Sequence, residues 1–191
     1  PYHLEGGCDI VFQIGTGKFG VRDAAGELSD SKLKELAEIP SIRMFEIKLS
    51  QGAKPGKGGI LPAVKVTDEI ATIRGITPGK AAISPNRFAE VESPNDLLDM
   101  IERVRTATGK PTGIKLCVGS MTDIETLFET IIHRGSQCAP DFITIDSADG
   151  GSGAAPMTLI DNVGMPIAES LPRVVDRLNR YELRERIKVV A

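Results

Sequence analysis

The strongest constraint on the fold is an alternation of short apolar runs with longer amphipathic segments, which begins near residue 42. The runs have the length of strands, and the segments between them place apolar residues at helical spacing. Strands that alternate with helices form parallel sheets joined by right-handed crossovers. The sequence therefore predicts an α/β fold with parallel strands. The expected strands span residues 9–14, 42–49, 114–118, 142–145 and 187–190.

Capping residues mark the ends of the helices. Ser93 before Pro94 predicts a helix start, and Gly109 predicts the end of the same helix. Thr67 and Asp30 are expected to be the N-caps of two shorter helices. The expected helices span residues 31–39, 68–74, 94–108, 123–134 and 166–180, while 1–8 and 83–92 show no regular pattern.

Composition excludes several classes of function. The 191 residues carry a net charge of −3, so no basic excess favours nucleic acid or an anionic membrane surface. No apolar run approaches the roughly 18 residues that a membrane span needs. The three cysteines form no CxxC pair, which argues against a metal or disulfide framework and favours a reducing, cytoplasmic location.

A loop rich in glycine and lysine follows the strand at 42–49. The stretch from Glu46 to Pro62 reads EIKLSQGAKPGKGGILP. Glycines let the backbone pass close to a ligand, and lysines such as Lys48 and Lys54 place positive charge around an anion. The alternative is a solvated surface loop without a ligand.

Two later strands carry further polar residues near their carboxyl ends. Lys115 lies within the run 114–118, and Asp146 opens the loop DSADGGSG. Because parallel strands end at one face, Lys48, Lys115 and Asp146 could line one pocket. The alternative is that each lysine pairs with a neighbouring carboxylate.

This set of residues suits a flavin and an acidic substrate. A reduced flavin carries negative charge near N1 and O2, and a strand lysine such as Lys115 would stabilise it. A carboxylate substrate such as a 2-oxo acid needs cationic groups, for which Lys48, Lys54 and Arg74 are candidates.

These motifs resemble those of a known family. The stretches EIKLSQGAKPGKGGILP, IATIRGITPGKAAISP, GIKLCVGS and DFITIDSADGGSGAAP are similar to the flavin-binding synthase domain of glutamate synthase. They resemble even more the shorter stand-alone proteins of bacteria and archaea built on that domain, as does the opening PYHLEGGCDIVFQIGTGKFGVRD. The resemblance covers nearly the whole chain.

The resemblance implies a (β/α)₈ barrel that binds FMN and reduces an imine formed from ammonia and a 2-oxo acid. It assigns the substrate carboxylates to Lys48, Lys54 and Arg74. It assigns the FMN ring to Gln51 and Lys115. The loop beside the cofactor would contain Asp146, Gly150, Gly151 and Gly153.

The sequence departs from the glutamate synthase pattern at three places. Ile60 replaces a substrate-contacting glutamine, and Ser84-Pro85-Asn86-Arg87 replaces a proline-proline-histidine type sequence at the pocket rim. By this resemblance, the first and last barrel strands, the loops for the FMN phosphate and the cysteines of an iron–sulfur cluster are expected to lie outside residues 1–191. Residues 1–191 are therefore expected to be the central part of one FMN-binding barrel, inactive as an isolated fragment.

Other functions stay open at this point. The barrel could be a non-catalytic module that binds an anion or nucleotide, or an FMN enzyme with a different substrate. The expected partners are a small 2-oxo acid or amino acid and an electron donor that the sequence does not identify. A second copy of the chain could cover the exposed sheet edges, which would give a homodimer.

Overall fold

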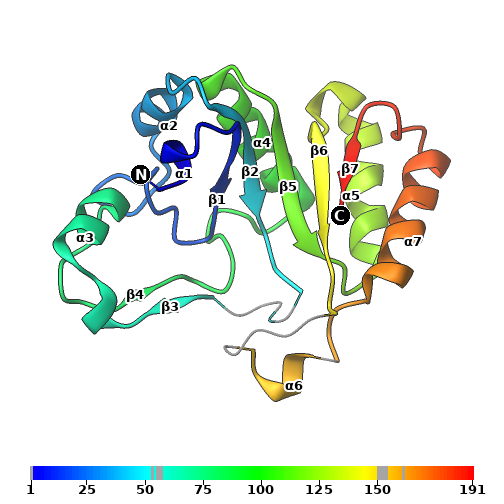
Figure 1. Ribbon diagram of the computed structural model, residues 1–191. Helices are drawn as coiled ribbons and strands as arrows, with labels where there is room; N and C mark the ends of the chain where they lie inside the picture. Colours follow the sequence, from blue (N-terminus) through cyan, green and yellow to red (C-terminus); the bar gives the residue numbers. More distant parts are fainter. Residues whose placement is uncertain (1, 53, 55–57, 150–154, 161) are drawn as a thin grey trace.

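The computed structural model describes residues 2–52, 54, 58–149, 155–160 and 162–191. Its centre is a sheet of five parallel strands in the order β1-β2-β5-β6-β7 (Figure 1). Each new strand is added beside the preceding one, as in a (β/α)₈ barrel. The α/β class and the portion of a barrel are confirmed. The strands are β1 (Ile10–Ile14), β2 (Ile42–Lys48), β5 (Thr112–Cys117), β6 (Phe142–Asp146) and β7 (Lys188–Val190).

Four helices connect these strands. They are α2 (Asp30–Ala37), α4 (Pro94–Thr108), α5 (Met121–Arg134) and α7 (Ile167–Arg180). The predicted cap of α4 is confirmed, because the Ser93 hydroxyl accepts from the Asp96 N–H and the Asp96 carboxylate accepts from the Ser93 N–H. Gly109 ends this helix in a left-handed conformation, as expected.

Two predicted helix starts were wrong. Ser29, and not Asp30, is the N-cap of α2, since its hydroxyl accepts from the Lys32 N–H. Helix α5 begins at Met121 with Ser120 as its N-cap, two residues before the predicted start. Ser29 precedes Asp30 by one position and Ser120 precedes Asp123 by three. In both helices the prediction placed the boundary at the aspartate instead of at the serine.

An antiparallel pair interrupts the alternation. Residues 60–92, here called the excursion, lie between β2 and α4 and include strands β3 (Ile60–Leu61) and β4 (Ala82–Ile83). The excursion also holds η1 (Ala63–Lys65) and α3 (Asp68–Arg74), whose N-cap is the expected Thr67. The expectation that 83–92 begins without regular structure is corrected by β4. Further short elements that the sequence did not indicate are α1 (Tyr2–Glu5), η2 (Ser136–Cys138) and α6 (Met157–Ile160).

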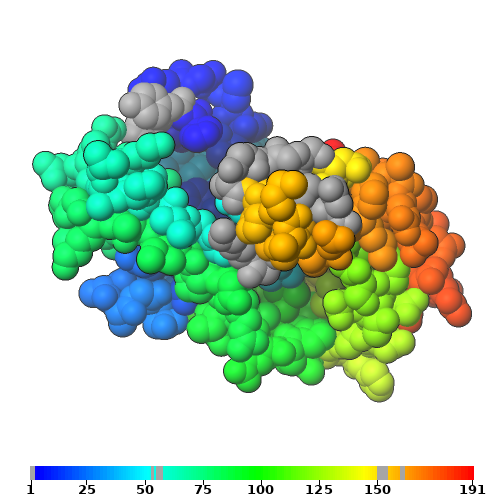
Figure 2. Space-filling model, turned by 90° about the horizontal axis from the view of Figure 1, so that it is seen from below, coloured from blue at the N-terminus to red at the C-terminus, as the bar shows by residue number. Residues whose placement is uncertain are grey.

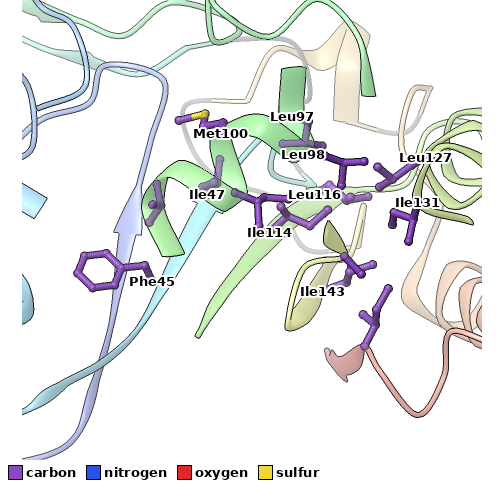
Figure 3. Packing of buried hydrophobic residues seen from close by; sticks show 14 of the residues in the cluster. Phe45, Ile47, Leu97, Leu98, Met100, Ile114, Leu116, Leu127, Ile131 and Ile143 are labelled. Atoms are coloured by element: carbon purple, nitrogen blue, oxygen red, sulfur yellow. The ribbon is translucent and has the colours of Figure 1, made fainter. Parts of the chain in front are cut away.

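The core lies between one face of the sheet and the helices. Ile47, Ile114 and Ile143 point from the sheet toward Leu98 and its neighbours on α4 and α5, whereas the ring of Phe45 points away from Leu98 and lies beside the ring of Phe12 (Figure 3). Apart from Phe12, each of these side chains is fully buried. Burying side chains of this size contributes about 1.5–3 kcal/mol each, so this face supplies most of the stability.

The opposite face of the sheet is polar. Its residues alternate with the core residues along each strand, and the strand register places Gln13 beside Glu46 and Lys48 beside Lys115. Glu46 is buried and accepts hydrogen bonds from Gln13 Nε2 at 2.7 Å and Thr144 Oγ1 at 2.5 Å. In a closed barrel this face is the interior.

Among the described residues no helix is long and apolar enough to cross a membrane, and no cluster of three metal-ligating side chains occurs. Strands β1 and β7 each have an outer edge without a partner strand in the described part of the chain. Coverage of these edges by a second copy stays a prediction.

Asp141 joins three strands at the amino end of the sheet. Its carboxylate accepts from the Thr112 N–H at 2.8 Å and contacts Arg105 at 3.2 Å and Arg186 at 2.9 Å. Its backbone carbonyl accepts from the Lys188 N–H. Charge-assisted hydrogen bonds of this kind are worth about 1.5–3 kcal/mol each.

We expect Asp141→Asn to lower the free energy of unfolding by about 2–3 kcal/mol, because one carboxylate serves two arginines and a strand N–H. Asp30→Asn is the control, because Asp30 pairs with Arg103 where both side chains are about half exposed. Such a pair contributes about 0–1 kcal/mol. Chemical denaturation measures both variants, and equal losses would contradict the role given to Asp141.

Candidate functional site

The carboxyl ends of the strands form one end of the molecule. The loops after β2 and β6 meet there, and Figure 2 looks onto this end from below. The cyan-to-green residues of the excursion occupy its left side, and the orange residues around α6 lie over its middle. Polar side chains from β2, β5 and β6 are therefore gathered beneath loops that are distant in the sequence.

Three of the predicted residues belong to adjacent strands here. Lys48 and Lys115 are register partners on β2 and β5 and point to the same face. Asp146 ends β6, and its Oδ2 is 3.4 Å from Lys115 Nζ. Asp146 Oδ2 also accepts from the Gly52 N–H at 3.2 Å, which ties the glycine-lysine loop to β6.

A small cavity of about 180 Å³ opens beside Lys48. It is called the lysine pocket here. Gln51 and Lys54 line it together with Lys48, so the structure brings these three predicted residues to one space. Its other lining residues are Gly15, Thr16, Leu49, Ser50, Gly58, Gly59, Ser84, Pro85 and Asn86.

The positive charge around Lys48 is only partly balanced by the carboxylates that the structure describes. Burial and then the neighbouring Lys115 ammonium lower the pKa of Lys48, and Lys54 acts in the same direction. Asp146 and Glu46 oppose this shift but do not cancel it. A group whose charged form is disfavoured gains from an anion beside it, so the pocket favours an anionic ligand.

Arg74 has a different position from the one expected. It stacks on the ring of Phe19, with its Cζ 5.5 Å from the ring centroid, and it does not line the lysine pocket. Arg22 approaches the same ring at 4.9 Å. The ring of Phe19 is close to Gly17, where an added Cβ would be 2.7 Å from it.

The loop beside the expected cofactor is described in part. Asp146 is placed, but Gly150, Gly151 and Gly153 lie outside the described residues. The preceding residues Ser147 and Asp149 are fixed, because both side chains accept from the Ile167 N–H at the start of α7.

A second cavity, of about 440 Å³, is larger but has different chemistry. It lies between the amino ends of α4 and α5 and shares Leu49 and Ser50 with the lysine pocket. Its walls are mainly aliphatic, and the described residues that line it include no lysine or arginine. Size alone would favour this cavity, but the convergent cations favour the lysine pocket.

The sequence did not indicate every residue of the site. Glu46 and Thr144 are hydrogen-bonded to each other on the same face of the sheet as Lys48, and Thr16 lines the lysine pocket. A carboxylate within the apolar run 42–49 was a usable signal for Glu46, because an unpaired buried charge is costly. Thr16 carries no such signal.

Comparisons with known proteins agree with this geometry. The family model described as the conserved region in glutamate synthase matches residues 1–191. The chain is 46% identical over 190 residues to the glutamate synthase large subunit-like protein YerD of Bacillus subtilis. The aligned region covers 100% of the chain and 36% of YerD.

This chain belongs to the glutamate synthase family. The archaeal-type glutamate synthase [NADPH] of Dehalococcoides mccartyi is 33% identical over 184 residues, across 92% of the chain and 36% of that protein. The archaeal glutamate synthase [NADPH] of Methanocaldococcus jannaschii is 34% identical over 191 residues, across 95% of the chain and 32% of that protein. The chain thus spans about a third of the length of these relatives.

The tight contact at Gly52 gives a test of the site. An added Cβ at Gly52 would be 1.4 Å from the Ser147 carbonyl oxygen, so the loops after β2 and β6 could not keep their contact. We expect Gly52→Ala to destabilise the protein by about 1–3 kcal/mol and to weaken anion binding in the lysine pocket at least tenfold. Thermal unfolding and titration with 2-oxoglutarate measure the two effects.

Gly59→Ala is the matched control. Gly59 lines the same pocket, but an added Cβ there meets no atom within 4 Å. We expect changes below twofold in affinity. Equal effects of both substitutions would show that the contact between the two loops does not shape the pocket.

The lowered pKa of Lys48 predicts a pH dependence of binding. An anion binds the ammonium form, and this form is lost as the pH rises through the lowered pKa. Anion affinity in the lysine pocket should therefore fall at a pH below the ordinary lysine value of about 10.4. Lys48→Arg should move this loss to higher pH, because arginine stays protonated. A pH profile unchanged by this substitution would contradict the assignment.

Proposed function

We propose that the intact protein is an FMN-dependent oxidoreductase that reduces an imine formed from a 2-oxo acid and ammonia. The observation that carries the proposal is the placement of Lys48 and Lys115 side by side at the carboxyl end of neighbouring parallel strands. Two adjacent cations at this end favour a site that holds two anionic groups, as a flavin and an acid substrate would require. Membership of the glutamate synthase family supports the same function.

The residues present fit a flavin. Asp146 orients Lys115 by an ion pair at 3.4 Å, and the Gln51 amide, which lines the lysine pocket, offers both a donor and an acceptor. Bound FMN would supply the hydride. Lys115 would stabilise the negative charge that the reduced ring carries near N1 and O2.

The substrate would be held by the lysine pocket. Lys48 and Lys54 would contact the carboxylate, and the wall from Ser84 to Asn86 would limit its length. A cavity of about 180 Å³ is below the 300–1,000 Å³ of typical ligand pockets, so it suits a small acid. Arg74 would have to leave the ring of Phe19 to reach the substrate, so its role stays a prediction.

A second candidate is an FMN enzyme of the same fold with another substrate. Ile60 is 63% exposed and does not line the lysine pocket, so it supplies no hydrogen bond there. This favours a 2-oxo acid other than 2-oxoglutarate. We propose in either case that residues 1–191 are the central part of the barrel and that the protein works in the cytoplasm.

Lys115→Met in the intact protein tests the cofactor assignment. Loss of the ammonium should weaken FMN binding about tenfold or more and lower its two-electron midpoint potential by tens of millivolts, where about 30 mV corresponds to 1.4 kcal/mol. Fluorescence titration and spectroelectrochemistry measure these effects.

Lys110→Met is the control for Lys115→Met. Lys110 is also part-buried, but its ammonium donates to the Ile39 and Ile42 carbonyls at the amino end of β2. FMN affinity and potential should not change in this variant. An intact protein that binds no FMN, or that turns over no 2-oxo acid with ammonia and a reductant, would refute the proposed function.

A further inference from the structure

Lys18 occupies an unusual position in the loop between β1 and α2. Its φ of 50° lies in the left-handed region, which costs a residue other than glycine about 1–2 kcal/mol. Its side chain is 7% exposed, although lysine is almost never fully buried unless it is paired. Strain and burial at one residue point to a constraint imposed by neighbouring segments.

The Lys18 ammonium joins two segments that are distant in the sequence. It contacts Glu27 Oε2 at 3.0 Å within its own loop and Glu90 Oε1 at 2.9 Å in the excursion. The carboxylates of these two residues are its two partners, and both raise its pKa. The pair with Glu90 therefore fixes the last part of the excursion to the β1–α2 loop.

Other contacts run between the same two segments. Thr16 Oγ1 donates to the Pro85 carbonyl at 2.6 Å, and Arg22 Nη2 donates to the Gly75 carbonyl at 3.0 Å. Gly17 is packed so closely that an added Cβ would be 3.1 Å from Ser84 Oγ. The β1–α2 loop thus supports the excursion at several points, with Lys18 as the buried ion pair among them.

Both segments contribute residues to the wall of the lysine pocket. Gly15 and Thr16 line it from the β1–α2 loop, while Ser84, Pro85 and Asn86 line it from the excursion. The position of the wall relative to Lys48 therefore depends on how the two segments are joined.

We propose that Lys18 is a positioning residue for the substrate: its ion pair with Glu90 holds the Ser84–Asn86 wall at the distance from Lys48 that a small dicarboxylate or 2-oxo acid requires. This inference rests on the proposed function for the identity of the ligand. The coupling between Lys18 and the Ser84–Asn86 wall is independent of the proposed function, because it is inferred from the contacts alone. Lys18 touches neither the reacting atoms nor the cofactor, so its loss should change substrate affinity more than the chemical step.

The two carboxylate partners provide a matched pair of variants. Glu90→Ala removes the ion pair between the segments, whereas Glu27→Ala removes a contact within one loop and leaves that ion pair in place. Both side chains are at least about one third exposed, so neither truncation opens a cavity in the core.

The experiment combines steady-state kinetics and hydrogen exchange on the intact protein, with 2-oxoglutarate as the probe acid. Glu90→Ala should raise KM about tenfold, with kcat within twofold. It should also accelerate amide exchange at 84–90 at least tenfold, without acceleration in β2. Glu27→Ala should change each quantity less than twofold. Lys18→Met should reproduce Glu90→Ala, and Lys18→Arg should restore most of the affinity.

Three outcomes would overturn the inference. These are an unchanged KM in Glu90→Ala, equal effects of Glu90→Ala and Glu27→Ala, and unchanged amide exchange at 84–90 in Glu90→Ala. If the protein does not turn over the acid, its binding constant replaces KM. If it binds neither 2-oxoglutarate nor a smaller 2-oxo acid, the exchange data alone decide whether Lys18 holds the wall, and the proposed function fails separately.

Discussion

The site depends on the parallel pairing of β2 with β5. This register places Lys48 and Lys115 side by side on one face of the sheet, so two ammonium groups are held where they repel each other. Two unit charges about 4 Å apart interact by about 4 kcal/mol at the effective dielectric of a protein surface. The ion pair with Asp146 offsets part of this repulsion at Lys115. A bound anion would relieve the repulsion that remains, which favours its binding.

The apolar face of the sheet offsets the cost of placing two lysines side by side on the polar face. Aliphatic and aromatic residues on the apolar face pack on α4 and α5, and their burial supplies the stability that the polar face lacks. A shift of β2 by one residue would exchange the two faces of that strand and turn Lys48 into the core. The apolar pattern of the strands therefore fixes the orientation of the lysines as well as the core.

Local signals in the sequence were sufficient for the sheet and most helices. The apolar runs identified all five parallel strands, and the capping box at Ser93 set the start of α4. The direction of parallel strands then placed Lys48, Lys115 and Asp146 at one end without any further information. These features depend on residues close together in the chain or on a general rule of topology.

The remaining features depend on contacts between distant residues. A lysine in a polar loop such as Lys18 reads as solvated, and its burial follows from Glu90, which is 72 positions away. Arg74 has the charge that a carboxylate site needs, yet the ring of Phe19 holds it elsewhere. The sequence shows the charge of Lys18 and of Arg74, but it does not show which distant residue each of them contacts. The walls of the lysine pocket thus depend on contacts between the β1–α2 loop and the excursion, which only the folded chain brings together. The position of Lys48 depends on β2, which the sequence alone predicts.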